Sequence, residues 1–166
     1  MKHKKGFTFI ELMVALTIVA LLSSLAIANY SIFQSKVRLS KLKLAFIETK
    51  TLSQDMLIDP PATANLAFML CSYEAYYVSA TEQYQAGWSG FPASPGASDL
   101  CFSAYNKMKA ILLNLNPGQG ARSLTWILFQ NGELSSVYGY IRMPNGDLTS
   151  CSDSNSRHEM LCTSPY

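Results

Sequence analysis

The stretch KKGFTFIELMVALTIVALLSSLA, residues 4–26, decides how this chain is organised. Glu11 is its only acidic residue, and the 24 residues from Leu12 to Ser35 carry no charge. As a helix with a rise of about 1.5 Å per residue, that run is long enough to cross a hydrocarbon core of about 30 Å. A carboxylate within such a segment is unfavourable by a few kcal/mol, so Glu11 needs a specific partner.

A short basic head precedes the apolar run. The three lysines within residues 2–5 mark its cytoplasmic side, because cytoplasmic flanks of membrane segments are enriched in Lys and Arg. A cleaved secretory signal peptide is the alternative, with cleavage among the small residues at 23–28. Such peptides, however, have shorter apolar regions of about 7 to 15 residues. The residues around Glu11 distinguish the two interpretations.

The segment from Gly6 to Glu11, GFTFIE, resembles the processing site of type IV prepilins and their relatives, the pseudopilins. In that family a prepilin peptidase cuts after the glycine, on the cytoplasmic side of the apolar segment, and the new N-terminal phenylalanine is N-methylated. The resemblance implies cleavage between Gly6 and Phe7 and retention of the apolar helix. It extends to about Ala26 and, more weakly, to about Phe46.

The resemblance also implies a division of the chain. Residues 1–6 form a leader, residues 7–35 a transmembrane and filament-core helix, and residues 36–166 an outer globular domain that begins with an amphipathic helix at 36–59. The precursor is expected in the inner membrane as a single pass with its N-terminus in the cytoplasm, and the mature subunit in an extracellular filament. The expected partners are other copies of the chain, the prepilin peptidase and the pilus assembly machinery.

For Glu11 the resemblance implies a role in subunit assembly. Cleavage gives Phe7 a positive α-amine, and the Glu11 carboxylate of a neighbouring subunit can pair with that amine in a low dielectric, so that each buried charge has a partner. Such a pair contributes little net stability but sets the register of packed helices. Alternatively, Glu11 reaches the lipid headgroups from its position near the cytoplasmic end.

The chain departs from the commonest type IV pilin pattern at Ala20 and Ala28, where glycine and proline are usual. Alanine is the better helix former by about 1 kcal/mol over glycine and about 3 kcal/mol over proline. The helix is therefore expected to be continuous, with local bending only through the hydroxyls of Ser23 and Ser24. A minor pilin or a type II secretion pseudopilin becomes a stronger alternative for this reason.

The helix is predicted to run from about Phe9 to about Ile58 and to stop at Asp59, because Pro60 and Pro61 lack amide donors. Its second half is amphipathic, with one apolar face that consists of Leu42, Ala45, Phe46, Thr49, Leu52, Ser53 and Met56. Lys36, Arg38, Lys41 and Lys43 cluster where the two halves meet. We interpret this cluster as a solvated face, with contacts to phospholipid or to acidic residues of another subunit as alternatives.

The middle third is predicted to be helical. Apolar residues spaced as in a helix at 66–77 indicate a short helix that carries Cys71. The stretch Gly87–Ser98 reads as a loop, and Ser98 or Asp99 is expected to cap a second helix up to about Leu115. The tyrosines of this region are interpreted as core and rim residues, with an adhesive or stacking surface as the alternative.

The last third is predicted to be strands. Residues 123–130 and 133–143 flank Asn131-Gly132, the strongest short hairpin signal, and residues 144–147 mark a second reversal into a strand at 148–151. A meander of three or four antiparallel strands results, covered by the amphipathic helix. The predicted class is α+β, a pilin ladle with the long helix as its handle.

Four cysteines (Cys71, Cys101, Cys151 and Cys162) lie far from the N-terminus, which favours two disulfides in an oxidising compartment over a metal site. Their order alone allows three pairings. The C-terminal segment CSDSNSRHEMLC resembles the disulfide-bounded loop of many type IV pilins, which implies a Cys151–Cys162 pair and leaves Cys71 with Cys101. Asp153, Asn155, His158 and Glu159 in that loop match no metal-ligand spacing, so no metal is assigned.

The outer part of the chain has a balanced charge, with ten basic and ten acidic residues from Lys36 onward, so nucleic acid is not expected as a general partner. His3 and His158 are the only histidines, and neither belongs to a nucleophile motif. No phosphate loop or nucleotide-binding fingerprint occurs. The sequence thus predicts neither an enzyme nor a cofactor.

The predicted function is that of a structural subunit of a type IV pilus, used for adhesion, twitching motility or DNA uptake. A minor pilin or a type II secretion pseudopilin is the alternative within the family. A membrane-anchored binding or catalytic domain, with an uncleaved N-terminal anchor, is the alternative outside it.

Overall fold

The computed structural model describes residues 8–60, 67–78, 80–91, 95–116, 120–153 and 159–163, without the side chains of residues 26–28, 31, 95 and 97. The chain forms two compact units that divide between Val37 and Arg38. The first unit is described as one helical segment, and the second contains all the strands.

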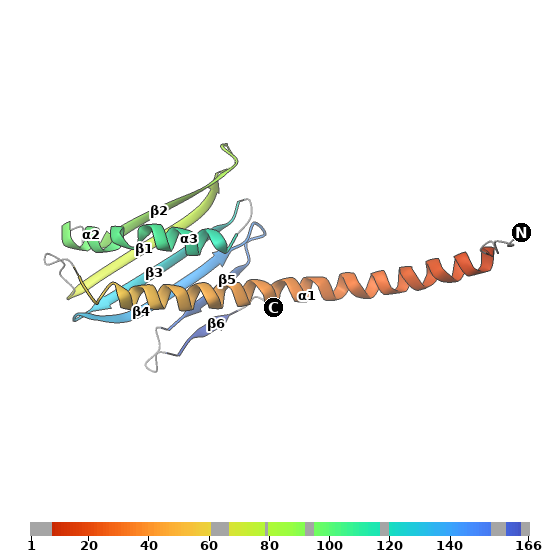
Figure 1. Ribbon diagram of the computed structural model, residues 1–166, viewed down its shortest axis with the longest axis horizontal. Helices are drawn as coiled ribbons and strands as arrows, with labels where there is room; N and C mark the ends of the chain where they lie inside the picture. Colours follow the sequence, from red (N-terminus) through yellow and green to blue (C-terminus); the bar gives the residue numbers. More distant parts are fainter. Residues whose placement is uncertain are drawn as a thin grey trace, which may run out of the picture. The chain divides into compact units, whose positions relative to one another are not determined.

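Helix α1 (Phe9–Asp55) is one uninterrupted helix of 47 residues (Figure 1). No glycine or proline occurs between Phe7 and Asp59, so nothing in this stretch removes a backbone donor or favours a turn. The regular helix ends slightly before the predicted Ile58, and the chain continues in tighter turns up to that residue.

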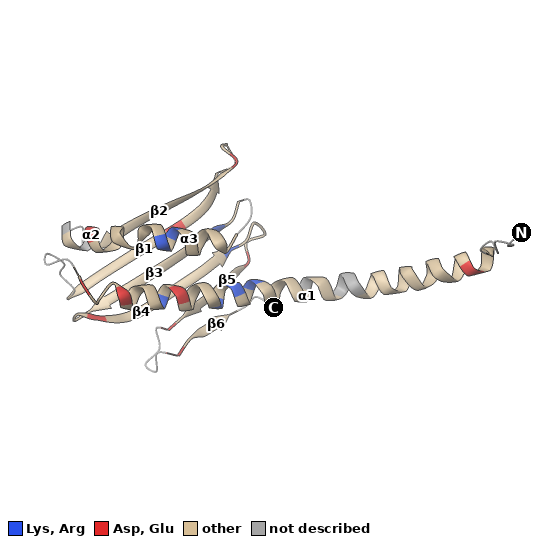
Figure 2. Ribbon diagram, in the orientation of Figure 1, with Lys and Arg blue, Asp and Glu red and all other residues tan. Residues whose placement is uncertain are grey.

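Charged residues divide α1 into two halves (Figure 2). Glu11 lies in the first turn, and the next charge along the helix is Lys36. The predicted apolar face of the second half is confirmed, because all seven of its residues are buried: Leu42, Ala45, Phe46, Thr49, Leu52, Ser53 and Met56.

Among the described residues six antiparallel strands, more than the predicted three or four, form one sheet in the order β2-β1-β3-β4-β5-β6. The strands are β1 (Phe68–Val78), β2 (Gln83–Phe91), β3 (Arg122–Gln130), β4 (Glu133–Arg142), β5 (Leu148–Ser152) and β6 (Leu161–Thr163). The predicted hairpin between β3 and β4 is confirmed. Asn131 (φ 52°) and Gly132 (φ 81°) both adopt positive φ, as a two-residue hairpin turn of this type requires.

The predicted helix at 66–77 is wrong, because Phe68–Val78 forms the strand β1. Met69, Cys71, Tyr73 and Ala75 are buried at alternate positions, which is the period of a strand with one face in the core. The predicted loop Gly87–Ser98 is also wrong at its two ends. Gly87–Phe91 completes β2, which pairs with β1 along its whole length, and Pro95–Ser98 is helical.

Two helices replace the single helix predicted from Ser98 or Asp99 to Leu115. Helix α2 (Pro95–Ser103) begins earlier than predicted, and Ala104 separates it from α3 (Tyr105–Asn114). Within the second unit, the second half of α1 and the helices α2 and α3 share one core with the inner face of the sheet (Figure 1). The centre of this core includes Leu42 from α1, Met108 and Leu112 from α3, and Ile127 and Phe129 from β3.

Candidate processing and assembly site

The first turn of α1 is closed by Thr8 and Glu11. The backbone N–H and the hydroxyl of Thr8 both donate to Oε2 of Glu11, at 2.9 Å and 2.8 Å, and the backbone N–H of Glu11 lies 3.4 Å from the Thr8 hydroxyl oxygen. This is a capping box, in which the residue before a helix and a Glu three positions later satisfy each other's free N–H groups. Glu11 therefore has a polar partner within its own chain.

The sequence predictions overlooked this partner, although Thr8 and Glu11 have the spacing of a capping box immediately before an apolar run. The predicted pairing of Glu11 with the α-amine of Phe7 is a different interaction, made between subunits after cleavage, and it stays a prediction. Gly6 and Phe7, the predicted processing residues, lie outside the described residues.

Large apolar side chains are exposed on all sides of the first half of α1. They include Phe9, Ile10, Leu12, Met13, Val14, Leu16, Ile18, Val19, Leu21, Leu22, Leu25, Ile32 and Phe33. Such an arrangement is typical of helices that are covered by lipid or by other helices. Within the part of the chain whose side chains are described, no helical stretch has both the length and the apolarity of a membrane span.

The hydroxyls of this half bond to the preceding turn of their own helix. Thr17 donates to the carbonyl of Val14, Ser23 to that of Val19 and Ser24 to that of Leu21, each at 2.8 Å. These donors are thus satisfied without water or a second chain. The helix remains continuous through Ser23 and Ser24.

The prokaryotic N-terminal methylation motif matches residues 1–27. The chain carries the type IV prepilin signature. No curated protein and no solved structure matches this chain. Its long N-terminal helix and its antiparallel sheet are consistent with the pilin fold, so the predicted α+β class is confirmed. The motif supports membership of the type IV pilin and pseudopilin family, which indicates a structural protein processed by a prepilin peptidase.

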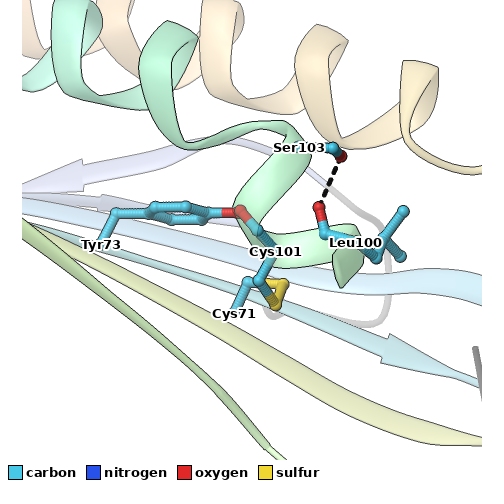
Figure 3. Close-up of a disulfide and its surroundings, with 5 residues drawn as sticks. All are labelled: Cys71, Tyr73, Leu100, Cys101 and Ser103. Atoms are coloured by element: carbon cyan, nitrogen blue, oxygen red, sulfur yellow. Dashed lines mark hydrogen bonds between the residues drawn. A yellow bond between two sulfur atoms is a disulfide. The ribbon is translucent and has the colours of Figure 1, made fainter. Parts of the chain in front are cut away.

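In the second unit, Cys71 of β1 is bonded to Cys101 of α2 (Figure 3), which we call the first disulfide. Both cysteines are fully buried. The prediction that Cys71 lies on a helix is corrected, since this residue lies on a strand. The bond fixes α2 against the inner face of the sheet.

Tyr73 supports the same contact from the next inward position on β1. Its hydroxyl donates to the carbonyl of Cys101 at 2.8 Å, so the ring and the disulfide hold the same turn of α2 (Figure 3). Only 1% of Tyr73 is exposed, and this burial raises the pKa of its hydroxyl well above the ordinary value. The interpretation of this tyrosine as a core residue agrees with its burial.

The second disulfide joins Cys151 of β5 to Cys162 of β6, which are directly opposite each other in the sheet. It closes the C-terminal segment, of which residues 154–158 lie outside the described part. Next to this disulfide, Ser150 and Thr163 are joined through their hydroxyls at 2.9 Å. The second disulfide therefore attaches the short edge strand β6 to the sheet.

Asp153 connects the end of β5 to β4 and to α1. Its Oδ1 accepts a bond from the backbone N–H of Val137 at 2.6 Å, and its Oδ2 lies 3.0 Å from Nζ of Lys50. The backbone N–H of Asp153 donates to the carbonyl of Val137 at 3.2 Å. Asp153 is 1% exposed, so these partners satisfy a buried carboxylate.

In the sequence, Asp153 stands out only as a possible metal ligand, and the structure places it in a structural contact instead. Glu159 is exposed, while Asn155 and His158 lie outside the described residues. Among the residues that are described, no three His, Cys, Asp or Glu side chains lie close enough together to hold a metal ion.

Proposed function

We propose that this prepilin is a structural subunit of a type IV pilus. A prepilin peptidase cuts between Gly6 and Phe7, Phe7 is N-methylated, and the mature chain assembles helix against helix into a surface filament. The methylation motif at residues 1–27 is the observation that carries this proposal. Adhesion, twitching motility or DNA uptake then follows from the assembled filament and not from a site within one subunit.

The proposal gives each segment of the chain a separate task. Residues 1–6 are the leader, residues 7–35 hold the precursor in the inner membrane and later form the filament core, and residues 36–166 form the outer domain. The exposed apolar side chains of the first half of α1 support this division, because they gain by burial in lipid or against equivalent helices. Thr17, Ser23 and Ser24 suit both environments, since their hydroxyls bond within the helix.

A minor pilin or a type II secretion pseudopilin is a second candidate. The observation in its favour is the uninterrupted α1, which has Ala20 and Ala28 where the common pilins have helix breakers. A subunit with this helix does not melt locally as easily in an assembled filament. The abundance of the chain in sheared filaments separates this candidate from a major pilin.

The charge of Glu11 and its helix cap can be tested separately. Glu11→Gln keeps a side chain that can serve in a capping box but removes the charge needed to pair with the α-amine of Phe7. Thr8→Ala removes the hydroxyl of the cap but keeps the Glu11 charge. Each variant is produced in a cell with the complete pilus machinery, and the cleaved N-terminus and the amount in sheared filaments are both measured by mass spectrometry.

We expect Glu11→Gln, Glu11→Ala and Glu11→Leu to be inserted and cleaved but not incorporated into filaments. Thr8→Ala is expected to be incorporated, and Glu48→Gln, an exposed acid in the second half of α1, serves as the control with normal incorporation. If Glu11→Gln forms normal filaments, the pairing with Phe7 is rejected. If Thr8→Ala alone fails, Glu11 acts mainly as a helix cap.

A further inference from the structure

The sheet has a second face that no described helix covers. Buried and accessible residues alternate along β3, where Ile127 and Phe129 are buried while Trp126 and Leu128 are not. The helices α1, α2 and α3 share a core with the side that carries Ile127 and Phe129. We call the opposite side, which carries Trp126, the outer face.

Three aromatic rings form a cluster at the centre of the outer face. Trp126 of β3 lies directly opposite Tyr138 of β4, with ring centroids 4.9 Å apart, and Tyr140 lies 5.9 Å from Trp126 and 6.1 Å from Tyr138. Trp126 is 37% exposed, so one part of its ring is open to a ligand. The hydrophobic core does not require these rings, since they lie on the other side of the sheet.

Two arginines border the aromatic cluster at one end. Arg122 and Arg142 are directly opposite each other on β3 and β4, an arrangement in which like charges repel. Glu74 compensates only in part, with its Oε2 3.8 Å from Nε of Arg122 and both side chains well exposed. Neither of the two ion pairs found among the described residues involves Arg142. A bound anion would relieve this repulsion.

Hydroxyl groups flank the rings on the neighbouring strands. Ser72 of β1 is the cross-strand neighbour of Trp126, and Ser152 of β5 is that of Tyr138. Ser150 stands in the same relation to Tyr140. The outer face therefore combines a central aromatic surface with hydrogen-bonding groups on both sides and a positive end.

We propose that the outer face binds an acidic saccharide, a sugar chain that carries carboxylate groups. The positively polarised C–H face of a sugar ring packs on the negative face of the Trp126 ring. The sugar hydroxyls bond to Ser72, Ser150 and Ser152, and a carboxylate is held by the planar fork of Arg142. Arg142 and Tyr138 are four residues apart on β4, which is about 13 Å along a strand and matches a short oligosaccharide.

Charge favours this ligand over a nucleic acid. Single-stranded nucleic acids also stack on aromatic rings, but they bind in grooves with positive charge along the whole backbone path. The outer face has its arginines at one end and includes Glu74 beside them, and the outer part of the chain as a whole is neutral. A ligand with a few carboxylates among many hydroxyls fits this distribution better.

The test uses the full chain in a polyoxyethylene detergent, which has no sugar headgroup. The probes are polygalacturonate, the uncharged polymer galactan, and oligo-dT as the nucleic acid. In a Trp88→Phe background, Trp126 is the only tryptophan, so its fluorescence reports binding at the outer face. Calorimetry gives affinities for the variants Arg142→Gln and Trp126→Leu, with Lys109→Gln on α3 as the matched control for lost charge.

We expect polygalacturonate to change the Trp126 fluorescence saturably, and Arg142→Gln and Trp126→Leu each to weaken binding about tenfold or more. Lys109→Gln is expected to bind normally, and a thermal scan of each variant verifies that it is folded. The proposal is overturned if polygalacturonate gives no saturable change, if galactan binds equally well, or if oligo-dT binds more tightly. It is also overturned if folded Arg142→Gln and Trp126→Leu retain full affinity.

Discussion

Replacing Asp153 tests whether a single buried carboxylate holds the C-terminal part of the sheet to α1. Asp153→Ala removes the acceptor for the backbone N–H of Val137 and the partner of Lys50. A hydrogen bond to a charged group contributes about 1.5–3 kcal/mol. The Lys50 ion pair adds about 0.5–1 kcal/mol, since 31% of the Lys50 side chain is exposed and solvent screens it.

The expected loss for Asp153→Ala is therefore about 2–4 kcal/mol of unfolding free energy. For a chain of this size that corresponds to a decrease in Tm of roughly 5–15 °C. Lys50→Met is expected to lose less unfolding free energy than Asp153→Ala, because the Asp153 carboxylate keeps its hydrogen bond from the backbone N–H of Val137. The double variant is expected to lose less than the sum of the two, as for any two residues in direct contact.

Urea unfolding of the full chain in detergent, with both disulfides intact and tryptophan fluorescence as the probe, measures these values. Glu133→Ala, which removes an exposed acid of the β3–β4 hairpin, is the control and is expected to change stability by less than about 0.5 kcal/mol. The reasoning is refuted if Asp153→Ala is as stable as Glu133→Ala, or if the effects of Asp153→Ala and Lys50→Met are simply additive.

Three further predictions concern the second unit. Tyr73→Phe loses the hydrogen bond to the Cys101 carbonyl, and its unfolding free energy at neutral pH should fall by about 1 kcal/mol. Burial raises the pKa of Tyr73, so the unfolded chain gives up this proton first and stability falls as the pH rises above about 10. Urea unfolding at high pH should therefore show a smaller fall in stability for Tyr73→Phe than for the unaltered chain. Replacing both cysteines of the first disulfide by serine should lower the unfolding free energy in urea by about 3.5 kcal/mol, and the same change at the second disulfide should lower it by about 3 kcal/mol. The first loss is larger because the two loops span 30 and 11 residues. Equal or reversed values would contradict the loop-length argument. Gly132→Ala, at φ 81°, should lower Tm and reduce the unfolding free energy by about 1–2 kcal/mol. Gly87→Ala should leave stability nearly unchanged, because its added Cβ meets only side-chain atoms at 3.8 Å or more.

The parts of the fold that the sequence predicts well depend on local signals. Helix α1 has no glycine or proline and ends before Pro60, and its buried face repeats with the period of a helix. The hairpin at Asn131-Gly132 depends on two adjacent residues that tolerate positive φ. Each of these elements is determined by residues close together in the chain.

Strand β1 was misassigned because both of its faces carry apolar or aromatic residues. The buried residues Met69, Cys71, Tyr73 and Ala75 alternate with a set that includes Leu70 and Tyr76, so the usual contrast between polar and apolar positions is weakened. An apolar run of this kind fits a helix equally well. The start of α2 did have a readable signal, since Pro95 is its first residue and proline is common there.

The contacts of Asp153 and Tyr73 could not be predicted from the sequence. Asp153 meets Lys50 from more than a hundred residues away, and Tyr73 meets Cys101 only because β1 and α2 face each other. Partners of this kind depend on the packing of complete elements. The capping box of Thr8 and Glu11, in contrast, is local and was readable from its spacing.

Mass spectrometry of filaments sheared from cells tests the central claim most directly. The account predicts a mature chain that begins at N-methylated Phe7, lacks residues 1–6 and contains both disulfides. If the chain dominates the filaments, it is a major pilin, and trace amounts indicate a minor pilin or a pseudopilin. A chain that keeps its residues 1–6 in the envelope and is never found cleaved would contradict the assignment.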